Sequence, residues 1–146
     1  MTNEKKSLDE KALQNVYQSA KMGTEAISKL MPKVQNREFK SAMSSQLSGY
    51  QDFIKRSSDM LTAMNRAPED ASLMQKIPSE LGMAFGVAMD KSDSKIAEMM
   101  INGSAMGLSE IKKTTSCNCM NKDTEKLVND VIAFEESNID GLKKFL

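Results

Sequence analysis

The sequence predicts an all-α fold in which four long helices form a bundle, and three observations support this prediction. Apolar residues recur every three or four positions along four long stretches, which is the spacing of one face of an α-helix. Polar residues that favour helix N-termini precede these stretches. The composition, 40% hydrophobic and 27% charged, is typical of a globular chain rather than a disordered one. At 146 residues, the chain is expected to form a single domain, residues 1–146.

The first helix is expected to begin at Ser7, because Ser7 and Glu10 have the spacing of a capping box. Pro32 should end this helix near Met31, since a proline ring clashes with the carbonyl group four residues earlier and provides no N–H donor. The inward face of the helix is predicted to carry Leu13, Val16, Ala20, Gly23, Ile27 and Leu30.

The second helix is expected to begin after Asn36, whose side chain can cap it, and to continue to about Met64. Only a few residues separate it from the first helix, and a connection this short makes two helices antiparallel neighbours. Residues 65–70, with Pro68 among them, have the composition of a loop. The predicted inward face consists of Phe39, Met43, Gln46, Tyr50, Phe53, Ser57, Met60 and Met64.

Between residues 71 and 91, one proline and two glycines interrupt a helical apolar stripe. We expect a short helix from about Ser79 to Asp90 and a break near Ser92. A continuous helix over residues 79–114 would be about 54 Å long at 1.5 Å per residue, which exceeds the roughly 40 Å of its neighbours. The long crossover between the second and third main helices is therefore expected to contain a short extra helix.

The third main helix is expected to start at the capping residues Ser92–Ser94 and to reach about Thr114, where a polar turn over residues 114–121 follows. The fourth should start at Asp123 or Thr124. The predicted inward faces are Ala97, Met100, Ser104, Gly107 and Ile111 in the third helix, and Val128, Val131, Glu135, Asn138, Leu142 and Phe145 in the fourth.

Two hairpins joined by one long crossover form the ferritin-like arrangement of a four-helix bundle. An up-down-up-down bundle with a fifth helix is the alternative. Metal-binding ferritin-like bundles hold iron or manganese with Glu-x-x-His motifs on inward helix faces. The last helix has this spacing in Glu135-x-x-Asn138 but carries asparagine in place of histidine, and the chain contains no histidine. The spacing therefore indicates a degenerate form of a ferritin-like metal site.

Residues 94–146, in the stretches SKIAEMMINGSAMGLSEIKK and LVNDVIAFEESNIDGLKKFL, resemble a group of uncharacterised ferritin-like four-helix-bundle proteins of anaerobic Gram-positive bacteria. Met22-Gly23 and Gln46-x-x-x-Tyr50 extend this resemblance into the first half of the chain. The resemblance implies the fold. Because the group has no assigned activity, the resemblance transfers no catalytic residue to this chain.

The polar positions of the predicted interior suit a hydrogen-bonded cluster better than a metal centre. Glu25 and Glu98 fall on the solvent faces of their helices, so the interior retains one carboxylate, that of Glu135. We expect no metal or other cofactor, because one carboxylate cannot hold two metal ions and a buried carboxylate must be hydrogen-bonded or protonated. Partial exposure of Glu135 through a shifted helix is the alternative. The buried polar cluster is expected to comprise Gln46, Tyr50, Glu135 and Asn138.

Glycines on inward helix faces predict close packing, since glycine in a helix interior costs roughly 1 kcal/mol relative to alanine. Gly23, Gly103 and Gly107 are therefore expected to lie where a neighbouring backbone approaches. Cys117 and Cys119 lie in the predicted polar turn, where accessible thiols could form a redox or metal-binding pair. Two sulfur atoms alone do not complete a zinc site, so reduced cytosolic thiols are the simpler interpretation.

The charge pattern argues against nucleic acid as a partner, because the formal net charge is zero and no basic stripe is present. No apolar run approaches the roughly 18 residues that span a membrane. The N-terminal residues lack the apolar core of a secretory signal, so we expect a cytoplasmic protein. The apolar face of residues 81–89 is expected to contact a second copy, as in a homodimer, or another protein partner.

The sequence predicts a non-enzymatic structural or interaction module. No histidine can act as a general base, and no serine or cysteine lies in a recognisable nucleophile motif, so no catalytic residue is assigned. Thirteen methionines and no tryptophan indicate a core filled by flexible side chains. The alternative is a carboxylate-bridged metal-binding protein or oxidoreductase of the ferritin-like class, which would take its missing ligands from a second subunit.

Overall fold

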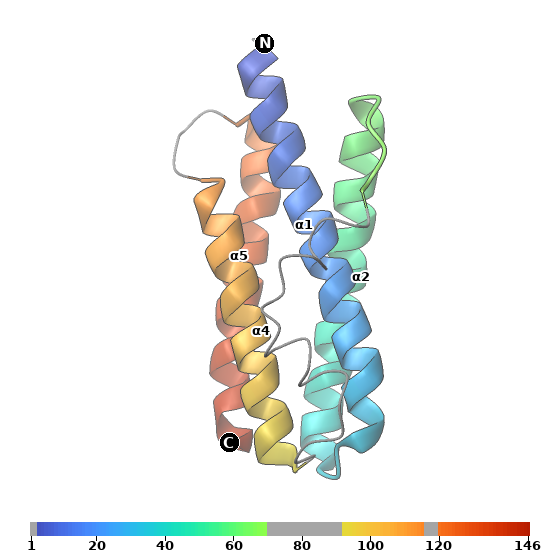
Figure 1. The fold of residues 1–146 in the computed structure, drawn as a ribbon, viewed down its shortest axis with the longest axis vertical. Helices are drawn as coiled ribbons and strands as arrows, with labels where there is room; N and C mark the ends of the chain where they lie inside the picture. The colour runs from blue at the N-terminus through green and yellow to red at the C-terminus, as the bar shows by residue number, and fades with distance from the viewer. Residues whose placement is uncertain (1–2, 70–91, 116–119) are drawn as a thin grey trace.

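The computed structural model describes residues 3–69, 92–115 and 120–146, which form four long α-helices (Figure 1). Short 3-10 helices follow the first and the last of them, at Met31–Lys33 and Lys143–Phe145. None of the described helices is long and apolar enough to cross a membrane. The four long helices are α1 (Asn3–Leu30), α2 (Arg37–Ala63), α4 (Asp93–Lys113) and α5 (Lys122–Leu142).

The directions of the helices give the topology. Figure 1 shows α1 and α5 running in one direction along the bundle, and α2 and α4 running in the opposite direction. Residues 64–92 therefore connect the end of α2 with the start of α4 at the other end of the bundle. Two hairpins with one long crossover confirm the predicted ferritin-like four-helix bundle. The short extra helix expected from about Ser79 to Asp90 lies outside the described residues.

The core forms where the inward faces of the four helices meet. Helix α1 packs mainly against α2, and α4 packs mainly against α5, while α1 also contacts α4 and α2 also contacts α5. Burial of these faces supplies most of the stability of the bundle, because helices of this length gain more from packing than from intrinsic propensity. The largest fully buried side chains include Leu13, Ile27, Phe39, Met43, Leu61, Ile96, Ile111, Leu127 and Leu142.

Helix α2 departs from its predicted inward face in its last turns. Met60 and Met64 are only partly buried, whereas Leu61 is fully buried. Leu61 follows the buried Ser57 by four residues, which keeps it on the same face because the helix has 3.6 residues per turn. The hydroxyl group of Ser57 donates a hydrogen bond of 2.6 Å to the carbonyl oxygen of Phe53, so its burial leaves no unpaired donor.

Two of the predicted helix caps are present in the structure. Asn36 Oδ1 accepts a hydrogen bond of 3.0 Å from the N–H group of Phe39, and Ser92 Oγ accepts one of 3.2 Å from the N–H group of Lys95. Each cap satisfies a backbone donor that the first turn of a helix leaves unpaired.

The first and last helices begin earlier than predicted. Helix α1 begins at Asn3, so the capping box predicted at Ser7 is wrong: the preceding glutamate and lysines are good helix formers and extend the helix beyond it. Helix α5 begins at Lys122, because Asn121 is its N-cap and accepts a hydrogen bond of 2.9 Å from the N–H group of Thr124.

Two aspartates, the partly buried Asp93 and the buried Asp9, form hydrogen bonds at the two ends of the bundle with residues far away in the sequence. At one end, the Asp93 carboxylate accepts hydrogen bonds from the backbone N–H groups of Gln35 at 2.9 Å and Asn36 at 2.8 Å. At the other end, the Asp9 carboxylate is fully buried and accepts hydrogen bonds of 3.0 Å from the backbone N–H and the Nδ2 atom of Asn121. These bonds join each hairpin to the other, which sets the register of the bundle that surrounds the interior site.

Candidate functional site

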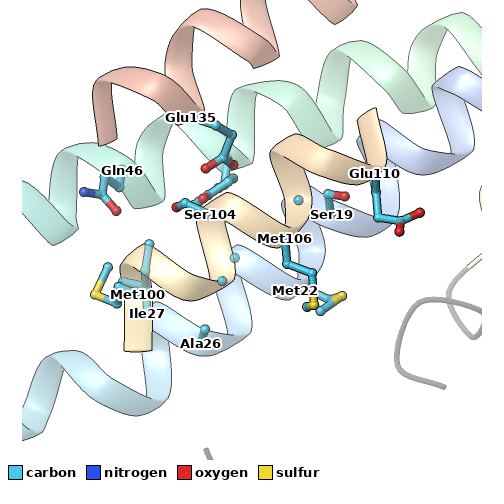
Figure 2. Close-up of a pocket in the computed structure, with 14 residues that line it drawn as sticks. Ser19, Met22, Ala26, Ile27, Gln46, Met100, Ser104, Met106, Glu110 and Glu135 are labelled. Carbon is cyan, nitrogen blue, oxygen red and sulfur yellow. The ribbon is translucent and has the colours of Figure 1, made fainter. Parts of the chain in front are cut away.

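A cavity of about 80 Å³ lies between α1 and α4, and side chains of α2 and α5 line it as well (Figure 2). Gln46 and Tyr50 of α2 and Glu135 of α5 form part of its wall. Most of the remaining wall is apolar. Helix α1 contributes Ser19, Met22, Gly23, Ala26 and Ile27, and α4 contributes Met100, Gly103, Ser104, Met106, Gly107 and Glu110.

The glycines of α4 border open space. A Cβ atom added at Gly103 or at Gly107 would meet no other atom within 4 Å among the described residues. The predicted close packing of these two glycines against a neighbouring helix is therefore wrong for the described helices, because both glycines border the space between α1 and α4. Gly23 differs, since a Cβ atom there would lie 2.6 Å from Cε2 of Tyr50. At Gly23 the missing side chain makes room for an aromatic ring, not for a neighbouring backbone.

Substitution of Gly103 or Gly107 by alanine should raise the free energy of unfolding by about 0.5–1 kcal/mol. Both positions lie inside α4 and have room for the added methyl group, and alanine loses less backbone entropy on folding than glycine. Urea denaturation of each single variant and of the wild-type protein measures the change. A loss of stability in both variants would show that the space beside α4 is not free.

Glu135 is the carboxylate in the wall of the cavity on α5, and it is only 4% exposed. Burial raises the pKa of its carboxyl group, while the nearby side chains of Tyr50, Ser104 and Asn138 act in the opposite direction and lower it. These contacts do not satisfy all of the hydrogen-bonding capacity of the Glu135 carboxyl group. Within the described part of the chain, the Oε2 atom of Glu135 and the Nδ2 atom of Asn138 both lack a hydrogen-bond partner of regular geometry. A buried acceptor and a buried donor without partners are costly to maintain.

Tyr50 places a hydroxyl group next to this carboxyl group. Burial raises the pKa of Tyr50 well above its usual value, and the negative charge of Glu135 raises it further. The hydroxyl group therefore stays protonated and can donate a hydrogen bond to Glu135. Phe134 holds the tyrosine ring in place through an edge-to-face contact, with ring centroids 5.0 Å apart.

The structure places all four residues of the predicted polar cluster in the interior. Gln46, Tyr50, Glu135 and Asn138 are each at most 9% exposed, so the alternative of a partly exposed Glu135 does not apply. Tyr50 and Asn138 interact with the Glu135 carboxyl group, and Gln46 lines the same cavity. Ser104 also interacts with this carboxyl group, although the predicted cluster omits it. Its place on the inward face of the third main helix was the signal that could have identified it.

The Glu135→Gln variant should become more stable relative to the wild-type protein as the pH rises. Because the pKa of Glu135 is raised in the folded chain, the folded state keeps this proton over a pH range in which the unfolded state has lost it. The wild-type free energy of unfolding therefore decreases as the pH rises from about 4.3, the ordinary glutamate value, to the raised value, and then levels off. Urea denaturation from about pH 4 to about pH 8 measures this difference. A stability difference that shrinks with rising pH would contradict the expected sign.

The ligand set of the interior does not fit the two-metal centre of a ferritin-like protein. Such a centre takes a glutamate from each of two helices and a Glu-x-x-His motif from each of the other two. Glu25 and Glu98 are exposed, and within residues 3–69, 92–115 and 120–146 no three histidine, cysteine, aspartate or glutamate side chains are grouped to hold a metal ion. The polar cluster around Glu135 combines one carboxyl group with amide and hydroxyl groups instead. The thiol pair Cys117 and Cys119 lies outside the described residues.

Comparison with known proteins shows the fold of this chain. No protein-family model matches the sequence, and no curated protein matches it significantly. A bacterioferritin-related protein from Bacteroides fragilis, described as a dodecameric thioferritin, superposes with a TM-score of 0.70 at 10% identity, over 96% of this chain and 84% of the other. YcfI from Rhodopseudomonas palustris, proposed to be a structural protein, gives a TM-score of 0.57 at 15% identity, over 90% of this chain and 88% of the other. At such identities the likeness shows the fold alone, which is that of a ferritin-like four-helix bundle.

Proposed function

We propose that this chain is a non-enzymatic structural or interaction module in which a polar cluster occupies the place of a ferritin-like metal centre. The observation that carries the proposal is the set of side chains around Glu135. One carboxyl group is surrounded by the hydroxyl groups of Tyr50 and Ser104 and the amide group of Asn138. Such a set can hydrogen-bond and fix the register of the helices, but it lacks the several carboxylate and imidazole ligands of a two-metal site.

Self-association is the second part of this proposal. The B. fragilis protein with the same fold is described as dodecameric, and the R. palustris protein is proposed to be structural. In the described part of this chain, Leu146 is the one large apolar side chain that is mostly exposed. An interface formed by the described surface would include many of its charged side chains, and its strength should fall as the salt concentration rises.

Metal analysis tests the first part of the proposal. Protein purified without a chelator is analysed for iron, manganese and zinc, and is then titrated with ferrous and manganous ions under anaerobic conditions. We expect less than one metal ion per ten chains and no saturable binding. Stoichiometric iron or manganese that disappears in the Glu135→Gln variant would overturn the proposal. It would favour a carboxylate-bridged metal protein or oxidoreductase that completes its ligand set with a second subunit.

Sedimentation velocity tests the second part. We expect a homodimer or a larger homo-oligomer at low salt, with a lower average mass at high salt because charged interfaces are screened. A strict monomer at every protein and salt concentration would contradict self-association. That outcome would leave the metal analysis unaffected, so the two parts of the proposal can fail separately.

A further inference from the structure

The cavity beside Glu135 has the features of a ligand site, and this goes beyond the structural role proposed above. We propose that it binds a small organic cation, a primary alkylammonium ion with a short apolar chain. The ammonium group would donate hydrogen bonds to the Glu135 carboxylate, and the chain would lie against the apolar wall between α1 and α4.

The charge of the cavity wall selects a cation. The described residues that line it include the carboxyl groups of Glu135 and Glu110 and contain no lysine or arginine. Glu110, at the end of the cavity in Figure 2, already forms an ion pair of 3.0 Å with Lys113. Glu135 lies deeper and has no such partner among the described residues of the wall. An anionic ligand would add a second buried charge of the same sign, whereas a cation would compensate the charge that is present.

The Glu135 carboxyl group also offers an unoccupied acceptor. Its Oε2 atom is buried and has no hydrogen-bond partner of regular geometry among the described residues, and the residue is only 4% exposed. Figure 2 shows Glu135 and Ser104 next to each other on the inner side of the cavity. An ammonium group has three donors, so it can bond the carboxylate and a neighbouring hydroxyl or amide oxygen at the same time.

The size and flexibility of the cavity limit the length of the chain. Its volume of about 80 Å³ is near half that of a roughly 150 Å³ apolar cavity that accommodates benzene. A ligand with about four carbon atoms is therefore the largest that fits without rearrangement. The side chains of Met22, Met100 and Met106 line the cavity, and methionine adapts its shape more readily than branched residues. A modestly longer chain can extend between these flexible side chains.

Three probes of equal chain length test the proposal: n-butylammonium, 1-butanol and butyrate. The complete chain is titrated with each, and amide shifts are followed by NMR. We expect saturable shifts with butylammonium, centred on the Gly23, Gly103 and Gly107 amides, with a dissociation constant on the order of 1 mM for so small a ligand. Binding of 1-butanol or butyrate as strong as that of butylammonium would overturn the proposal, because the carboxylate would then play no part in recognition.

Two pairs of variants separate the cavity from the surface. Glu135→Gln should weaken butylammonium binding at least tenfold, whereas Glu136→Gln, on the exposed face of the same helix, should leave it unchanged. Gly103→Leu should abolish binding by filling the cavity, whereas Gly141→Leu, at an exposed glycine with free space around it, should not. Circular dichroism shows that each variant is folded. Equal effects of the two members of either pair would assign the binding to the surface and overturn the proposal.

Butylammonium binding should also tighten as the pH rises. Glu135 must be ionised to pair with the cation, and its pKa is raised by burial. Among the described residues of the cavity wall, the other titratable groups are Tyr50 from α2 and Glu110 from α4, while those of α1 carry none. Tyr50 stays neutral, so a change in affinity between about pH 5 and about pH 8 reports Glu135. We expect the Glu110→Gln variant and the wild-type protein to bind butylammonium with the same affinity. In both proteins this affinity should increase with pH. Loss of the pH dependence in Glu110→Gln would reassign the site to the rim and overturn the proposal.

Discussion

Replacement of Asp9 by alanine is expected to lower the free energy of unfolding by about 3 kcal/mol, because hydrogen bonds to a charged group are worth roughly 1.5–3 kcal/mol each. The Asp9 carboxylate is fully buried in α1 and accepts two hydrogen bonds of 3.0 Å from Asn121, at the start of α5. Alanine would leave the partly buried N–H group of Asn121 without this partner. It would also release the side chain that caps α5 through the N–H group of Thr124.

Urea denaturation measures the effect of Asp9→Ala, and hydrogen exchange locates it. Asp59→Ala is the matched control, because Asp59 is an exposed aspartate that pairs with Lys55 at 2.8 Å within α2, and such surface pairs contribute little. The free energy of unfolding of Asp9→Asn should lie between those of Asp9→Ala and Asp59→Ala, since the amide oxygen of asparagine can replace one of the two carboxylate acceptors. In Asp9→Ala, faster exchange of backbone amide hydrogens should be confined at first to the N-terminal turn of α5. Equal stability of Asp9→Ala and Asp59→Ala would show that the link between α1 and α5 is not stabilising.

Replacement of Gly49 by alanine is expected to lower the free energy of unfolding by about 1–3 kcal/mol, because the added methyl group would overlap a side chain that packs against the core. A Cβ atom at Gly49 would lie 2.2 Å from Cε2 of Phe134, which is far closer than two carbon atoms can approach. Phe134 cannot simply move aside, because its ring also makes edge-to-face contacts with Tyr50 and Phe53, at centroid distances of 5.0 and 5.1 Å. The better helix propensity of alanine, worth about 1 kcal/mol, does not offset this overlap.

Gly141→Ala is the matched control for Gly49→Ala. Gly141 is also a helical glycine, but an added Cβ atom there would meet nothing within 4 Å of it among the described residues, so this variant should gain stability. Thermal unfolding should therefore shift in opposite directions, downward for Gly49→Ala and upward for Gly141→Ala. Combination of Gly49→Ala with Phe134→Leu should restore part of the loss, because leucine removes the ring atoms that overlap. A stabilising effect of Gly49→Ala would contradict the close contact with Phe134.

Much of the fold could be predicted because helical periodicity is a local property. The three- and four-residue spacing identified the inward faces, and the short and long connections separated two hairpins from a crossover. The caps at Asn36 and Ser92 could be predicted for the same reason, since a cap bonds a backbone group three residues away. The early start of α1 could not be predicted from the capping box, because the residues before Ser7 are good helix formers and continue the helix towards the N-terminus.

The interior site could be predicted only in part. Periodicity placed Gln46, Tyr50, Glu135 and Asn138 on inward faces, and the structure buries all four. The resemblance to ferritin-like bundles suggested which positions to compare with metal ligands. Neither source could indicate how far apart the helices lie. The expected close packing at Gly103 and Gly107 is therefore wrong, and the cavity that these glycines border had no local signal.

The sequence by itself determined that four long helices form and, for most of their length, which face of each helix is buried, because both depend on neighbours within about one turn along the chain. The tertiary structure alone decided which glycine touches a ring, which carboxylate lacks a partner, and where empty space remains. Gly49 meets Phe134, and Asp9 meets Asn121, across long stretches of chain. Such contacts depend on the distance and rotation between packed helices, which follow from how all four side-chain surfaces fit together and not from the period of any one of them.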